Sequence, residues 1–89
     1  MDEQTMWIGG AWLGASDGAT GEVIDPSNGE AIATVPKATL DDVNAAVSAS
    51  RAALNDPSWA SMDPAERGRI LQRMAAVTYA HAKALATIE

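Results

Sequence analysis

The stretch IDPSNGEAIATVP, residues 24–36, crowds oxygen-bearing side chains around a single glycine and then continues into β-branched residues. A calcium-binding EF-hand loop beginning at Asp25 would need glycine at its sixth position and glutamate at its twelfth. Those positions hold Glu30 and Pro36, so the register of a calcium loop fails. Residues 26–29 instead combine a proline that fixes φ with a glycine that accepts a positive φ, which is typical of a tight turn. The stretch therefore predicts a turn between two strands.

Residues 1–36 as a whole are rich in glycine, β-branched residues and turn signals. Apolar residues 7–8 and 11–13 flank Gly9 and Gly10, and this pattern predicts a short β-hairpin with a Gly-Gly turn. A further strand is expected over residues 31–35, with Ile32 and Thr34 on one face, and Pro36 ends it. This part of the chain is therefore predicted to be a β-rich hairpin segment.

After residue 37 the pattern changes to an alanine-rich helical periodicity. Thr39 and Asp42 form a capping-box-like signal, which predicts a first helix over residues 39–55. Asp63, Pro64 and Glu66 supply an N-cap, a proline at the first helical position and an acidic first turn, which predict a second helix over residues 63–89. The second helix has an apolar stripe at three- and four-residue spacing, made of Ile70, Leu71, Met74, Val77, Thr78, His81, Leu85 and Ile88.

This stripe continues to Ile88, next to the last residue, and no glycine, proline or basic last turn ends the helix. We therefore expect residues 1–89 to form a single partial domain of a longer polypeptide, with its second helix truncated. The predicted fold class is an α+β fragment, in which a β-hairpin and short antiparallel strands are followed by two α-helices.

Composition and charge exclude several classes of function. Six basic and twelve acidic residues give a net charge of −6, which argues against binding to nucleic acid or to an anionic membrane surface. The chain has no cysteine, so disulfides, thiolate metal sites and cysteine nucleophiles are excluded together. The N-terminal MDEQTM lacks the apolar core of a signal peptide, and no apolar run approaches the ~18 residues of a membrane span. These features predict a cytoplasmic location.

No catalytic constellation can be assembled from the remaining residues. The glycines of residues 9–14 resemble a dinucleotide fingerprint only in part, and no helix follows them to receive a pyrophosphate. His81 lies on the apolar stripe, which favours a partly buried structural role over a catalytic one. Trp59 is expected to pack between the two helices. The cluster of Arg67, Arg69 and Arg73 is expected to form a solvated face or to pair with carboxylates outside this chain. From its residues alone, the chain is interpreted as a scaffold.

The order of several segments resembles the N-terminal segment of the NAD(P)-dependent aldehyde dehydrogenases. The segments are WIGGAW, GEVIDPSNGEAIATVPKAT, LDDVNAAVSASRAAL and SWASMDPAERGRILQRMA. The resemblance covers residues 7–89, and its most specific part is DPSNGE at residues 25–30, where the family pattern is N-P-A-T-G-E. Asp25 replaces the usual asparagine and keeps the same turn chemistry. The resemblance implies that the chain is part of the α/β coenzyme-binding domain of that fold.

The resemblance also implies an activity for the complete enzyme, which would oxidise an aldehyde to the carboxylic acid with NAD or NADP. In the family a cysteine thiolate attacks the aldehyde, an asparagine helps to hold the oxyanion and a glutamate acts as general base. Those residues lie downstream of this segment, so neither catalytic nor cofactor-binding residues are expected here, and the chain alone is expected to be inactive and to bind no cofactor. Some members hold a monovalent cation on backbone carbonyls that match Val23 and Ile24, with the remaining ligands beyond Glu89.

Three hypotheses therefore remain open. The first is a fragment of an aldehyde dehydrogenase, whose partner is the remainder of that polypeptide and whose complete form is a homo-oligomer. The second is a non-catalytic scaffold or interaction module that docks on a full-length homologue. The third is a small metal-binding protein built on residues 24–36.

Overall fold

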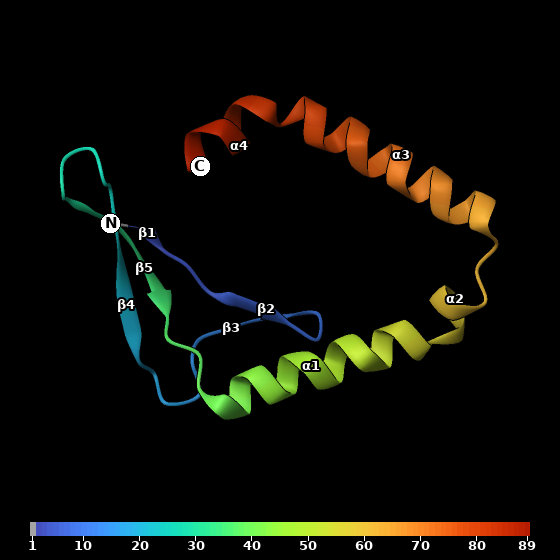
Figure 1. Ribbon diagram of the computed structural model, residues 1–89, viewed down its shortest axis with the longest axis horizontal. Helices are drawn as coiled ribbons and strands as arrows, with labels where there is room; N and C mark the ends of the chain where they lie inside the picture. Colours follow the sequence, from blue (N-terminus) through green and yellow to red (C-terminus); the bar gives the residue numbers. More distant parts are fainter. Residues whose placement is uncertain (1) are drawn as a thin grey trace. The chain divides into compact units, whose positions relative to one another are not determined.

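The computed structural model of the chain describes residues 2–89, which divide into two compact units, one ending at Asn55 and one running from Asp56 to Glu89 (Figure 1). The first unit contains β1 (Asp2–Glu3), β2 (Met6–Ile8), β3 (Ala11–Leu13), β4 (Thr20–Ile24), β5 (Ala31–Pro36) and α1 (Leu40–Asn55). The second contains α2 (Pro57–Ala60), α3 (Pro64–Ala80) and α4 (Ala82–Ile88). No helix of residues 2–89 is both long enough and apolar enough to cross a membrane.

The strands of the first unit form two small sheets. β2 and β3 pair as the predicted antiparallel hairpin, in which Trp7 is opposite Trp12 and the two ring centroids are 4.8 Å apart. Gly9 and Gly10 have φ angles of 60° and 82°. Positive φ at both central residues is the requirement of a type I′ turn, which matches the twist of the flanking strands. The second sheet has the order β1-β5-β4, with β4 antiparallel to β5.

Helix α1 begins at the predicted capping box. The Thr39 N–H donates to Asp42 Oδ2 at 2.9 Å, and the Asp42 N–H donates to Thr39 Oγ1 at 3.2 Å. The loop before β4 is tied to the same cap, because the Ser16 N–H donates to Asp42 Oδ2 at 3.1 Å. The N–H groups of Thr39 and Ser16 lower the pKa of Asp42, since their hydrogen bonds favour the charged carboxylate. The Asp42 carboxylate therefore fixes both the start of α1 and the position of the loop between β3 and β4.

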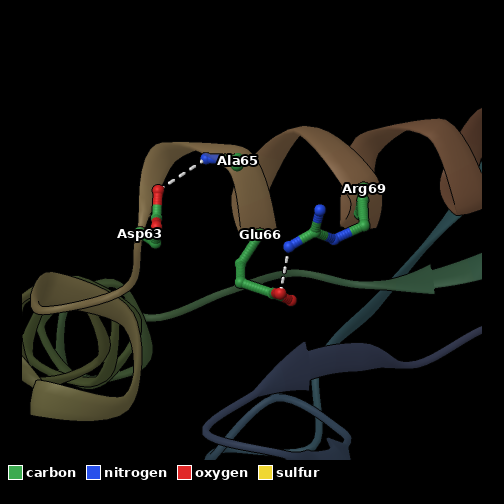
Figure 2. Close-up of polar contacts among 4 residues, drawn as sticks. All are labelled: Asp63, Ala65, Glu66 and Arg69. Atoms are coloured by element: carbon green, nitrogen blue, oxygen red, sulfur yellow. Dashed lines mark hydrogen bonds and ion pairs between the residues drawn. The ribbon is translucent and has the colours of Figure 1, made fainter.

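In the second unit, α3 begins at the Asp-Pro-Ala-Glu signal (Figure 2). Asp63 Oδ1 accepts a hydrogen bond of 3.0 Å from the Ala65 N–H, and Pro64 occupies the first helical turn, where no N–H is needed. Glu66 pairs with Arg69 three residues later on the exposed side of the helix. An acidic side chain in the first turn also interacts favourably with the helix dipole.

The helix predicted over residues 63–89 is interrupted at His81, which separates α3 from α4. The His81 N–H is shared between the carbonyls of Val77 and Thr78, which marks a tightened last turn. Thr78 Oγ1 also donates to the Met74 carbonyl at 2.8 Å, and this kind of back-bonding bends helices. The interruption thus arises from hydrogen bonding within the last turn of α3, without glycine or proline.

The α+β class, the hairpin, the short strands and the first helix are as predicted. Two further details differ from the prediction. β1 runs parallel to β5, with Asp2 opposite Ala33, although only antiparallel pairing was expected. A short helix, α2, also precedes α3, and Asp56 caps it by accepting hydrogen bonds from the N–H and the hydroxyl of Ser58. No side chain of residues 2–89 is buried, so both units keep their apolar residues partly or largely exposed.

Candidate functional site

The residues between Asp25 and Glu30 form a turn that uses its own polar groups. Asp25 Oδ1 accepts hydrogen bonds from the Ser27 N–H at 2.8 Å and from Ser27 Oγ at 2.6 Å. Asn28 Oδ1 accepts a hydrogen bond of 2.9 Å from the Glu30 N–H, and Gly29 has a φ of 75°. The bonds from Ser27 lower the pKa of Asp25 because they stabilise its charged form. The oxygen atoms that suggested a calcium loop therefore hold the β4–β5 turn.

Val23 and Ile24, the two residues matched to a cation site by resemblance, end β4 beside an irregularity of the ladder. Val23 is opposite Ala33, whereas Ile24 is opposite Ala31, so Ile32 is an extra residue on β5. Such a β-bulge disrupts the ladder locally and re-aims nearby backbone groups. Peptide carbonyls are suitable ligands for monovalent cations. The assignment of these two carbonyls as cation ligands stays a prediction.

His81 and Trp59 take positions that the sequence indicated only in part. His81 is exposed, contrary to the expected partial burial, and its Nδ1 lies 2.9 Å from the Val77 carbonyl at the end of α3. Trp59 is 37% exposed, and the Arg67 guanidinium lies 4.7 Å from the centre of its ring. Arg67 also donates to the Trp59 carbonyl at 2.7 Å. Arg67 thus connects α2 to α3, which corrects its assignment to a solvated face.

This contact joins residues on two different helices, and neither helical periodicity nor charge patterning could reveal it. The close spacing of Trp59, the Asp63 cap and Arg67 is the one feature of the sequence that could have indicated it. A cation over an aromatic ring is stabilised by the ring quadrupole, so this contact holds the Arg67 guanidinium against Trp59. The role of Arg67 is therefore to fix the connection that leads into α3.

Among residues 2–89 no group of three or more His, Cys, Asp or Glu side chains could hold a metal ion. The remaining features are apolar surfaces. One groove of about 320 Å³ lies between the β2–β3 turn and α1. A Cβ added to Gly9 would lie 3.8 Å from the Ala49 Cβ. These small residues let the hairpin approach the helix closely. The groove contains no cluster of nucleophile, base and oxyanion donors, so it offers a binding surface without catalytic groups.

One apolar surface of the second unit is a face of α3. An open hollow of about 530 Å³ is lined by Ile70, Arg73, Met74, Val77 and Thr78. Met74 is 59% exposed and Val77 60% exposed. Exposed apolar side chains that recur along one helix face are typical of a surface that packs against another part of a protein. We call the face formed by these five residues the α3 face.

The aldehyde dehydrogenase family model matches residues 12–89. The chain is 40% identical over 84 residues to phenylacetaldehyde dehydrogenase of Pseudomonas fluorescens, a match that covers 94% of this chain and 17% of that protein. It is 45% identical over 75 residues to 2-hydroxymuconic semialdehyde dehydrogenase of Pseudomonas sp. (strain CF600), covering 84% of this chain and 15% of that protein. A cytosolic 10-formyltetrahydrofolate dehydrogenase of Xenopus tropicalis is 38% identical over 84 residues, a match that covers 94% of this chain and 9% of that protein.

Among solved structures, the chain resembles an NAD-dependent aldehyde dehydrogenase from Sinorhizobium meliloti with a TM-score of 0.89 and 34% identity. This likeness covers 98% of the present chain and 18% of the solved one. The chain thus spans between 9% and 17% of the length of the curated relatives described above. Nearly all of its structure therefore corresponds to a small part of a much larger protein.

Proposed function

The chain belongs to the aldehyde dehydrogenase family, and we propose that it serves as the N-terminal segment of an enzyme that oxidises an aldehyde to the carboxylic acid with NAD or NADP. The observation that carries this proposal is the likeness of 98% of the chain to a part of an NAD-dependent aldehyde dehydrogenase. The dehydrogenase names of the relatives also support it. Cysteine is absent, so the thiolate that the family mechanism requires would come from outside these 89 residues.

In this proposal the chain contributes structure, and bound NAD(P) supplies the hydride acceptor elsewhere in the complete enzyme. Asp63 and Arg67 fix the start of α3, and the α3 face would pack against the rest of the coenzyme-binding domain. Packing of that face would remove Met74 and Val77 from water, which is favourable in proportion to the apolar area covered. The segment would thereby help to hold the coenzyme-binding domain in its active arrangement and to form the homo-oligomer.

A segment exchange tests this proposal. The matching 84-residue part of the Pseudomonas fluorescens phenylacetaldehyde dehydrogenase is replaced by the present chain, which is 40% identical to it. We expect the chimera to reduce NAD(P) in the presence of phenylacetaldehyde, because the fold and the α3 face are supplied intact. The readout is the absorbance of the reduced coenzyme.

Two controls define the result of the exchange. The parent enzyme with the segment deleted should be inactive, and the present chain alone should give no aldehyde-dependent reduction, since it has no cysteine. A chimera that is expressed in soluble form but is inactive would contradict the proposal. A fully active deletion variant would also contradict it, because the segment would then have no structural role.

We also propose that the carbonyls of Val23 and Ile24 contribute to a monovalent cation site of the complete enzyme. The support is the irregular ladder at Ile32 and the affinity of carbonyl oxygens for such ions. Crystals of the chimera grown with rubidium or thallous ions should show an anomalous scattering peak beside both carbonyl oxygens. A map without a peak at that position would refute the assignment of these two residues.

A further inference from the structure

The turn between β4 and β5 contains an asparagine followed by a glycine, Asn28-Gly29, on an exposed surface. A Cβ added to Gly29 would meet no atom within 4 Å, so no other side chain packs against Gly29 on that side. Glycine also leaves its own nitrogen unshielded and lets the backbone reach conformations that other residues avoid.

One hydrogen bond of the turn is made by the Asn28 carboxamide that would react. The bond of 2.9 Å from the Glu30 N–H to Asn28 Oδ1 closes a ring that contains both the Asn28 carboxamide carbon and the Gly29 nitrogen. The same N–H is placed to stabilise negative charge that develops on Oδ1 when this carbon is attacked. The carbon and the nucleophile therefore belong to one hydrogen-bonded ring, and the carboxamide oxygen has a donor.

The nucleophile is restrained by one other contact. The Gly29 N–H donates to the Asp25 carbonyl at 2.8 Å, so this bond must open before the nitrogen can react. Opening of an exposed turn requires no unpacking of a core, and all the contacts involved lie between Asp25 and Glu30. Reaction at this site therefore depends on local motion of the turn alone.

We propose that Asn28-Gly29 is a site of spontaneous chemical modification, at which the Gly29 nitrogen attacks the Asn28 carboxamide carbon. The nitrogen gives up its proton to a solvent base as the new N–C bond forms. The bond from the carboxamide carbon to Nδ2 breaks, and Nδ2 leaves as ammonia after taking up a proton from water. The cyclic imide that results is then hydrolysed by water at either of its two carbonyls, which produces aspartate or isoaspartate at position 28.

The products alter the turn in two ways. Either product adds one negative charge to a chain whose net charge is −6, and this charge lies between the carboxylates of Asp25 and Glu30. Isoaspartate also lengthens the backbone of the turn by one atom. The first pair of the β4–β5 ladder, Ile24 opposite Ala31, lies next to this turn. Like charges and a longer turn both oppose pairing of β4 with β5. Modification should therefore loosen this hairpin.

The test is incubation of the purified full chain in mildly alkaline buffer, followed by peptide mapping with mass spectrometry. Asn44 and Asn55 serve as internal controls, because alanine and aspartate follow them and both lie in α1. We expect Asn28 to convert roughly tenfold faster than either, since a following side chain shields the attacking nitrogen. Two products should appear, separable by chromatography. Equal rates at the three asparagines would overturn the proposal.

A pair of variants at position 30 tests whether the Glu30 N–H activates the Asn28 carboxamide. Glu30→Pro removes the N–H that donates to Asn28 Oδ1, whereas Glu30→Ala keeps this N–H and removes the same carboxylate. We expect Glu30→Pro to convert severalfold more slowly than Glu30→Ala. Asn28→Thr should abolish the mass change in this peptide without affecting Asn44 or Asn55. If the two variants at position 30 convert at the same rate, the Glu30 N–H has no part in the reaction.

Discussion

The isolated chain is expected to unfold without a cooperative heat-absorption peak and with weakly protected amides in α1 and α3. The physical reason is that no side chain of residues 2–89 is buried. Full burial of a large aliphatic side chain contributes about 1.5–3 kcal/mol, whereas ordering the backbone costs about 1–2 kcal/mol for every residue. Leu71 and Val77, each 60% exposed, obtain only part of that contribution. Local hydrogen bonds and caps cannot replace the missing core.

Calorimetry and hydrogen exchange measure this directly, and the chimera described above is the matched control. In the chimera the same residues should show strong protection and take part in a cooperative transition. A cooperative melt of the isolated monomer above ~60 °C, with well-protected amides in both helices, would contradict the expectation. That result would favour an independently stable interaction module over a segment of a larger domain.

Local signals predicted much of the fold because the responsible contacts lie close together in the sequence. The caps at Thr39 and Asp63 each bond to groups two or three residues away, and the Gly-Gly turn fixes the register of β2 with β3. The bond from Ser16 to Asp42 joins residues 26 positions apart, so no local pattern could predict it. The parallel pairing of β1 with β5 was missed because the acidic residues of β1 carry no apolar alternation.

The candidate sites were less accessible to sequence reasoning. The oxygen-rich turn was interpreted correctly because its hydrogen bonds follow from residue types at fixed spacing. Val23 and Ile24 could be suggested only by resemblance, because carbonyl ligands leave no trace in side-chain chemistry. The contact of Arg67 with Trp59 joins two helices, which residue spacing does not show. His81 was expected on a continuous helix, whereas its N–H is shared between two carbonyls where α3 ends. Spacing alone could not show that the helix ends there.

In the chimera, Met74→Asp is expected to lower aldehyde oxidation by more than about tenfold. Met74 lies at the centre of the α3 face and is 59% exposed in the chain by itself. If that face packs against the rest of the coenzyme-binding domain, a carboxylate at this position loses its hydration and gains no oppositely charged group in return. The penalty for an unpaired buried charge is several kcal/mol, and each 1.4 kcal/mol corresponds to about a factor of ten in the assembled fraction.

Gln72→Asp is the matched control for this substitution, because it adds the same charge two positions earlier on a different side of α3. Gln72 is exposed and lies outside the α3 face, so the carboxylate there stays in water and activity should remain close to that of the unchanged chimera. In the isolated chain the helix content should differ little between the two variants, since neither position is buried. Initial rates and circular dichroism separate the two effects. Equal activity of the two chimeric variants would show that the α3 face is not a packing surface. A loss confined to Met74→Asp in the chimera would identify that face as the place where the segment joins the rest of the enzyme.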